Sequence, residues 1–160
     1  MLKIITVDYQ NPLQMADLLL LLDLYAQDPQ GGAEPLSESC RLQLPAALQQ
    51  CPAALSLIAY QNSKPVGLLN AFKTVSTFAG RPLINIHDLA VAPAFRGQGI
   101  ARALLQQIEQ IAREQDCCKL TLEVLSGNQT AQHTYLRSGF AAYELDPAQG
   151  QALFWQKKLD

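Results

Sequence analysis

Residues 83–115 read LINIHDLAVAPAFRGQGIARALLQQIEQIAREQ, and this stretch decides the fold. The mostly apolar run from Leu83 to Val91 predicts a strand. Gly97-Gln98-Gly99 predicts a tight turn, after which apolar residues recur at helical spacing. These residues are Ile100, Ala101, Leu104, Leu105, Ile108, Ile111 and Ala112. The stretch therefore predicts a strand, a glycine loop and an amphipathic helix that packs on a sheet.

The glycine loop has the properties of an anion-binding turn. Backbone N–H groups at a helix N-terminus lack intrahelical partners, and the helix dipole makes that end positive. A dinucleotide fingerprint would need glycine or alanine three residues after Gly99, where Arg102 stands. A Walker loop would need Lys-Ser/Thr after its last glycine, and that is also lacking. The loop therefore predicts a phosphate site of another kind.

Composition limits the class of protein. The chain has 160 residues, of which 49% are hydrophobic and 16% charged, so we expect one globular domain over residues 1–160. The net charge of −2 and the lack of a Lys/Arg run argue against nucleic acid as a partner. The leucine-rich run 18–22 is too short for a membrane span or a signal peptide. We expect a cytoplasmic protein that does not bind membranes.

The cysteines do not predict a metal centre. Cys40, Cys51, Cys117 and Cys118 lack the paired Cys-x-x-Cys spacing of a zinc site. We expect reduced structural thiols and no metal.

The remaining pattern predicts a mixed order of strands and helices. We expect strands at 3–8, 54–60, 65–73, 119–125, 141–144 and 151–159. We expect helices from Asn11-Pro12 to before Asp28, at 42–50, from the glycine loop to about Gln115, and from Gly127-Asn128 to Gly139. Gly127-Asn128 offers an N-cap to the last helix, and Gly139 would end it as a left-handed residue. Strands 54–60 and 65–73 should form a hairpin. The strand, helix and strand over 83–125 should form a right-handed parallel crossover.

Two spacings resemble one known family. Arg96-x-x-Gly99-x-Ala101 resembles the coenzyme A loop of the GCN5-related N-acetyltransferase (GNAT) superfamily, Arg/Gln-x-x-Gly-x-Gly/Ala. Asn128, Ala131, Tyr135 and Gly139-Phe140 are similar to its Asn-x-x-Ala-x-x-x-Tyr-x-x-x-Gly-Phe pattern. The resemblance is specific from about Leu83 to Phe140. It implies an α/β fold, in which a central mixed sheet is flanked by helices, as in acyl-CoA N-acyltransferases.

The resemblance also implies acetyl-CoA as the acyl donor. The expected coenzyme-binding residues are Leu89, Ala90, Val91, Arg96, Gly97, Gln98, Gly99, Ile100, Ala101, Arg102, Asn128 and Ala131. Arg102 could reach the extra phosphate of the nucleotide or lie on a solvated helix face. Tyr135 would lie near the sulfur and return a proton to the departing thiolate.

Aminolysis of a thioester also needs a polarised carbonyl and a base. A backbone N–H at Leu89 or Ala90 would polarise the carbonyl if the strand is splayed there. His87 stands where superfamily members often carry an acidic base, and Glu123 or a water are alternatives. Strand residues alternate faces, so His87 and Asp88 should share a cleft only if a bulge intervenes. Asp88 is expected to be structural, with substrate binding as the alternative.

We therefore expect an N-acetyltransferase that transfers acetyl directly to a primary amine in a ternary complex. The acceptor would be a small molecule, with a peptide N-terminus or lysine as the nearest alternative. A non-catalytic acyl-CoA sensor, O-acetylation and a longer acyl donor remain open. Segments 28–39 and 146–151 would select the acceptor. The apolar segment Ala152–Trp155 could pair across a homodimer interface or belong to the core.

Overall fold

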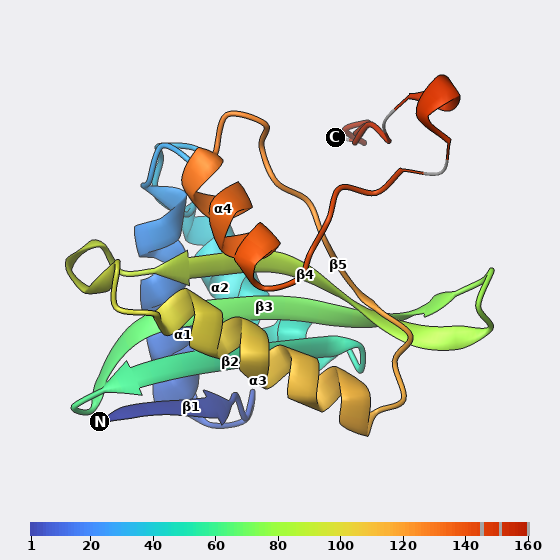
Figure 1. The fold of residues 1–160 in the computed structure, drawn as a ribbon. Coiled ribbons are helices and arrows are strands. Elements are labelled where there is room, and N and C mark those ends of the chain that lie inside the picture. Colours follow the sequence, from blue (N-terminus) through green and yellow to red (C-terminus); the bar gives the residue numbers. More distant parts are fainter. Residues whose placement is uncertain (145, 151, 160) are drawn as a thin grey trace. The chain divides into compact units, whose positions relative to one another are not determined.

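The computed structural model describes residues 1–144, 146–150 and 152–159 (Figure 1). The chain forms two compact units, Met1–Leu122 and Glu123–Asp160, which are described separately below. The expected single domain over residues 1–160 stays a prediction.

The first unit is built on a five-stranded mixed sheet with the order β1-β2-β3-β4-β5. Its strands are β1 (Leu2–Thr6), β2 (Ala54–Gln61), β3 (Lys64–Ser76), β4 (Arg81–Val91) and β5 (Leu120–Leu122). The first four strands pair antiparallel, and β4 pairs parallel with β5. The predicted hairpin and parallel crossover are therefore confirmed, although β3 and β4 extend further than expected and β5 is shorter.

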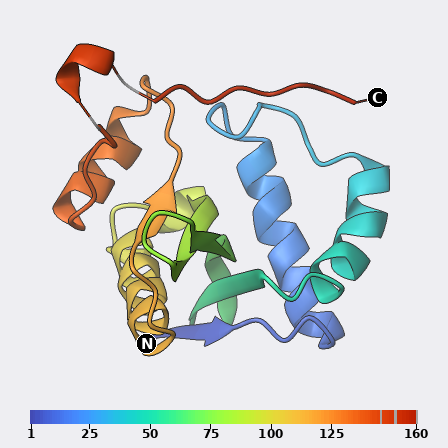
Figure 2. The same ribbon diagram turned by 90° about the vertical axis from the view of Figure 1, so that its right-hand side faces the viewer.

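Two helices cover one face of this sheet, α1 (Pro12–Ala26) and α2 (Glu38–Gln49) (Figure 2). The side chain of Asn11 caps α1 by accepting N–H bonds from Leu13 and Gln14. Leu13 and Leu20 of α1 are exposed. The core under both helices consists of Val7, Met15, Leu18, Leu21, Leu48, Ile58 and Leu68.

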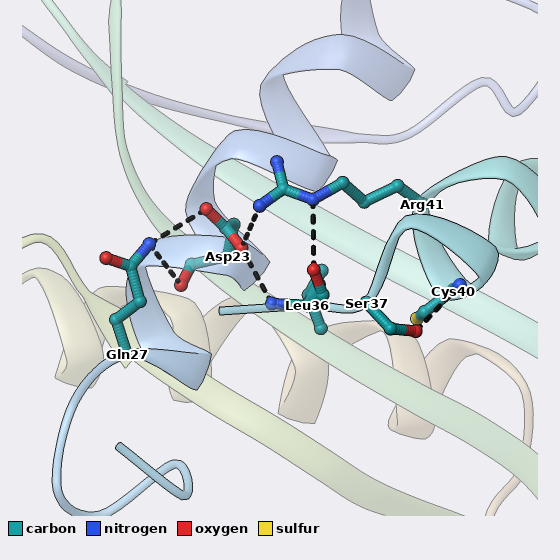
Figure 3. A network of polar contacts seen from close by, with 6 residues as sticks. All are labelled: Asp23, Gln27, Leu36, Ser37, Cys40 and Arg41. Atoms are coloured by element: carbon teal, nitrogen blue, oxygen red, sulfur yellow. Dashed lines mark hydrogen bonds and ion pairs between the residues drawn. The ribbon is translucent and has the colours of Figure 1, made fainter. Parts of the chain in front are cut away.

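A polar network fixes the connection between α1 and α2 (Figure 3). Asp23 Oδ1 accepts bonds from the Leu36 N–H at 2.9 Å and from the Arg41 guanidinium at 2.7 Å. Ser37 Oγ accepts the Cys40 N–H at 3.1 Å and so caps α2. Because Ser37 is a good N-cap, α2 begins at Glu38 and not near Leu42 as the sequence predicted.

The predicted stripe helix is α3 (Ile100–Glu114), and it lies on the other face of the sheet (Figure 2). Its buried residues are Ile100, Leu104, Leu105, Ile108 and Ala112, whereas Ala101 and Ile111 are half-buried. The helix approaches β3 closely at Gly67. A Cβ there would lie 3.0 Å from Ile100 Cγ2 and 3.3 Å from Leu104 Cδ1. This contact fixes the first turn of α3, and hence the glycine loop, over the sheet.

The second unit contains α4 (Gln129–Arg137) and a 3₁₀ turn, Pro147–Gln149. Asn128 caps α4 as expected, since its Oδ1 accepts the Ala131 N–H at 3.1 Å. Gly139 follows the helix with φ of 88°. The N–H of Phe140 bonds Tyr135 O, and the N–H of Gly139 bonds Leu136 O. This is a Schellman motif, which confirms the predicted left-handed helix end.

The two strands predicted near the C-terminus are wrong where the structure describes them. Residues 141–144 and 152–159 form no strand, and Gln151 lies outside the described residues. Leu153, Phe154 and Trp155 are 74–81% exposed, so Ala152–Trp155 is neither a strand nor core. Apolar alternation supplies strand propensity, but a strand also needs a neighbouring backbone to satisfy its N–H and C=O groups.

Candidate active site

The glycine loop turns sharply between β4 and α3. A 3₁₀ turn, Pro93–Phe95, precedes it, and both Gly97 and Gly99 have left-handed backbone angles, φ of 77° and 79°. Gly99 is the N-cap of α3 and offers no side chain to its first N–H groups. A Cβ at Gly97 or Gly99 would meet no atom within 4 Å. The first N–H groups of α3 therefore have no side-chain cap, and the two glycines that precede them lie in open space, as an anion site requires.

Arg96 acts on this loop through other protein groups. Its Nε donates to Val91 O at 3.1 Å, and its guanidinium bonds Asp28 Oδ2 at 2.7 Å. The Gln30 N–H and then Arg96 hold the pKa of Asp28 below its usual value of 3.8. The carboxylate is therefore ionised at neutral pH. The pair joins the end of α1 to the glycine loop, a link between residues 68 positions apart that sequence spacing gave no way to predict.

Among the residues that the structure describes, the carboxyl-terminal half of β4 has no paired strand at one edge, which is called its open edge. Pairing with β5 stops at Ile86↔Leu122, while pairing with β3 continues to Val91. The Ala92 N–H bonds Val66 O at 2.9 Å, which sets the phase of the antiparallel ladder. Backbone N–H groups alternate in direction along a strand, so the Ala90 N–H points toward β3. The N–H groups of Leu89 and Val91 point the other way, toward the open edge where β5 no longer pairs. Of the two amides considered from sequence, the register favours Leu89.

A bulge interrupts β4 at His87. Asn70 pairs with Asp88 and Ala71 pairs with Ile86, so His87 is the extra residue. The His87 ring is exposed and lies against Phe72, with ring centroids 4.6 Å apart. Phe72 and Asn70 are two residues apart on β3 and share a face. The bulge therefore brings His87 and Asp88 to the same face, the condition that the sequence had left open.

Tyr25, near the end of α1, also belongs to this region of the first unit. Burial raises the pKa of Tyr25, and the negative charges of Asp88 and then Asp28 raise it further. The two carboxylates therefore act on one phenol. No local spacing in the sequence points to Tyr25, because its neighbours here come from β4 and from the segment after α1.

Three predicted residues lie in the second unit. Asn128 uses its Oδ1 for the helix cap, which leaves its amide nitrogen for another partner. Ala131 and Tyr135 lie one turn apart on α4. The Tyr135 ring contacts Phe140 edge to face, with centroids 5.9 Å apart. This ring contact spans the Schellman motif, so the Tyr-x-x-x-Gly-Phe spacing also stabilises the helix end.

The other predicted residues lie as follows. Gln98 is exposed in the loop, 3.4 Å from Gln61 between side-chain amides. Arg102 lies on the exposed face of α3, and Glu123 is exposed just beyond β5. Among the described residues, no three His, Cys, Asp or Glu side chains converge as a metal site would need. In the same part of the chain, no helix is long and apolar enough to cross a membrane.

Residues 19–140 match the family described as Acetyltransferase (GNAT) family. The chain belongs to this family. This match confirms the family that the two spacings resembled and the fold that the resemblance implied. GNAT members are acetyltransferases that use acetyl-CoA.

Among curated GNAT relatives, streptothricin acetyltransferase of Streptomyces lavendulae is 43% identical over 82 residues, covering 51% of this chain and 43% of its own length. Thialysine N-epsilon-acetyltransferase of Bos taurus is 35% identical over 79 residues, covering 49% of this chain and 45% of its own. This chain therefore spans less than half the length of either relative.

A solved GNAT structure shows the same fold over nearly the whole chain. AAC(6')-Iy, in complex with the bisubstrate analogue CoA-S-monomethyl-acetylneamine, superposes with a TM-score of 0.77 at 16% identity and covers 99% of both chains. At this identity the likeness shows the fold alone.

Proposed function

We propose that this protein is an acetyl-CoA-dependent N-acetyltransferase that acts on a primary amine of a small molecule. The observation that carries the proposal is the glycine loop: Gly97 and Gly99 have left-handed backbone angles, a Cβ at either would lie in open space, and no side chain caps the first turn of α3. Family membership supports acetyl-CoA as the ligand of that turn. The names of the relatives support amine acceptors such as streptothricin and thialysine.

The coenzyme would lie along the open edge of β4. The amides of residues 97–101 would bind its diphosphate, and the outward N–H groups of Leu89 and Val91 would bind its pantetheine arm and the thioester carbonyl. Asn128 and Ala131 would contact the coenzyme from α4. In this assignment Arg96 holds the loop through Asp28 instead of touching a phosphate.

The acceptor would approach the face that carries His87 and Asp88. An alkylamine with a pKa near 10.4 must lose a proton before it attacks, which costs about 4.6 kcal/mol at pH 7. Asp88 would hold the ammonium form, and His87 would take the proton directly or through a water. Glu123 or water alone remain the alternatives for this base.

Acetyl transfer would then occur in one ternary complex. The amine nitrogen attacks the thioester carbonyl carbon, the C–N bond forms, and the C–S bond breaks. After attack the nitrogen loses its second proton to solvent. Tyr135 donates its phenolic proton to the departing thiolate and is reprotonated from solvent, so one proton is released overall for each ammonium consumed. No cysteine is acylated in this scheme.

A panel of acceptors with acetyl-CoA tests the proposal. We would follow free thiol release and product mass with streptothricin, thialysine, neamine, lysine and a peptide with a free N-terminus. Turnover of one of the first three with intersecting initial-velocity lines supports direct transfer to a small amine. Turnover of the peptide alone would indicate a peptide acetyltransferase. Coenzyme binding without any thiol release would indicate an acyl-CoA sensor.

A further inference from the structure

A row of polar side chains crosses three neighbouring strands beneath α1 and α2. The Tyr9 hydroxyl lies 2.9 Å from Ser56 Oγ, and Ser56 Oγ bonds Asn70 Oδ1 at 2.7 Å. Asn70 Nδ2 donates to Asp88 Oδ2 at 2.9 Å. Ser56, Asn70 and Asp88 are direct register partners on β2, β3 and β4, so the row follows the sheet at right angles to its strands.

The chemistry of the row fixes the direction of every hydrogen bond. An ionised carboxylate only accepts, so Asn70 must turn its NH₂ toward Asp88 and its carbonyl oxygen toward Ser56. Ser56 must then donate its single proton to Asn70, and Tyr9 must donate to Ser56. All the protons in the row therefore point toward Asp88. Hydrogen bonds aligned in one direction polarise and strengthen one another.

Burial of this row of polar side chains in the core costs desolvation free energy. Ser56 and Asn70 are 1% and 5% exposed, and they share their face with the buried Ile58 and Leu68. Apolar residues there would avoid the desolvation cost of two buried polar groups. The row instead ends at Asp88, a half-buried carboxylate. Within the described residues, no arginine or lysine pairs with Asp88, and Asn70 is the one side chain that donates a hydrogen bond to it.

We propose that Asn70 is a positioning residue, held by Ser56 and Tyr9, which orients the Asp88 carboxylate toward the ammonium group of the acceptor. By occupying Oδ2, Asn70 fixes the plane of the carboxylate and leaves Oδ1 for the ligand. A cation at Oδ1 would give this half-buried carboxylate the opposite charge that the neutral Asn70 does not supply. This inference rests on the proposed function, because it assigns the acceptor to the face of Asp88.

A double-mutant cycle separates positioning from a merely structural role. Thialysine binding is measured by calorimetry at saturating CoA for the wild type, Asn70→Leu, Asp88→Asn and the double variant. We expect each single substitution to weaken binding by about tenfold, the size of one hydrogen bond to a charged group. The double variant should bind no more weakly than Asp88→Asn alone, because Asn70 acts through Asp88.

Matched variants keep the test decisive. Ser56→Ala, in the same cycle with Asp88→Asn, replaces Asn70→Leu if the latter does not fold, and Tyr9→Phe should show a smaller effect of the same sign. Ser76→Ala removes a buried hydroxyl on β3 that lies outside the row, and it should leave the dissociation constant unchanged. CoA affinity should be unaltered in all of them.

Equal thialysine affinity in wild type, Asn70→Leu and Asp88→Asn would overturn the inference, and so would additive losses in the double variant. The cycle needs no turnover. If no acceptor gave thiol release, the proposed function would be refuted, and the binding cycle would still test the role of Asn70. Additive losses in the double variant would refute the positioning role of Asn70 and would leave the proposed acetyl transfer unaffected.

Discussion

At the residue scale, Tyr135 has two roles that a substitution can separate. Its ring packs on Phe140 at the end of α4, and its hydroxyl is the proposed proton donor. Tyr135→Phe keeps the ring and removes the hydroxyl. We expect kcat to fall by about a hundredfold, typical of losing a general acid, with unchanged affinity for acetyl-CoA. Steady-state kinetics and calorimetry measure both, and Tyr143→Phe is the control in the same unit.

The proposed role of His87 as the base is tested by replacing each of the two histidines of the chain separately. His87→Gln should lower kcat/KM for the amine by about a hundredfold, since it removes the proton acceptor at the bulge of β4. The exposed His133 lies on α4 and has no proposed role, so His133→Gln should leave kcat/KM for the amine unchanged. An equal kcat/KM for His87→Gln and the wild type would transfer the role to Glu123 or a water.

At the element scale, the ion pair between Asp28 and Arg96 couples the end of α1 to the glycine loop. Asp28→Ala should raise KM for acetyl-CoA by about threefold, because a partly exposed pair contributes at most about 1 kcal/mol. Asp23→Ala is the matched control, since it breaks a similar pair with Arg41 in the α1–α2 connection (Figure 3). An equal rise in KM in both variants would count against a specific link to the loop.

The close packing of α3 on the sheet at Gly67 gives a second prediction at this scale. Gly67→Val would press on Ile100 and Leu104, so we expect a loss of about 1–3 kcal/mol in unfolding free energy, as for an overpacked core, together with weaker coenzyme binding. Denaturant unfolding and calorimetry measure the two effects. Gly127→Val adds the same side chain where a Cβ meets nothing within 4 Å, and it should lose little.

The sequence predicted best those elements whose pattern is local. The apolar stripe of α3, the cap at Asn128 and the left-handed Gly139 all follow from neighbours within one or two turns, and the structure has them. The strands expected after Gly139 failed because their partners cannot be read from the same few residues. The early start of α2 was missed although Ser37 is a recognisable cap.

The candidate site divides in the same way. The glycine loop is contiguous, so its motif was visible in the sequence. The bulge at His87, the pairing of Arg96 with Asp28 and the row from Tyr9 to Asp88 depend on strand register and on contacts between distant segments. Register follows from the packing of a whole sheet, which no single stretch of residues encodes.

At the scale of the whole molecule, the proposal assigns acetyl-CoA contacts to the amides of the glycine loop and to Asn128 and Ala131. Acetyl-CoA should therefore slow amide hydrogen exchange at the first turn of α3 and also at the first turn of α4, because bound ligand opposes local opening. Exchange followed by mass spectrometry, with and without acetyl-CoA, measures this. Protection confined to the first turn of α3 would remove Asn128 and Ala131 from the coenzyme site.

The central claim is that the amides around Gly99 bind the diphosphate of acetyl-CoA, and calorimetric titration of Gly99→Val tests it most directly. Gly80→Val is the control, because Gly80 also has a left-handed φ, 60°, and open space around it, but lies in the turn between β3 and β4. We predict at least about tenfold weaker binding for Gly99→Val, the loss of one charge-assisted bond, and wild-type binding for Gly80→Val. Wild-type affinity in a folded Gly99→Val protein would contradict the account.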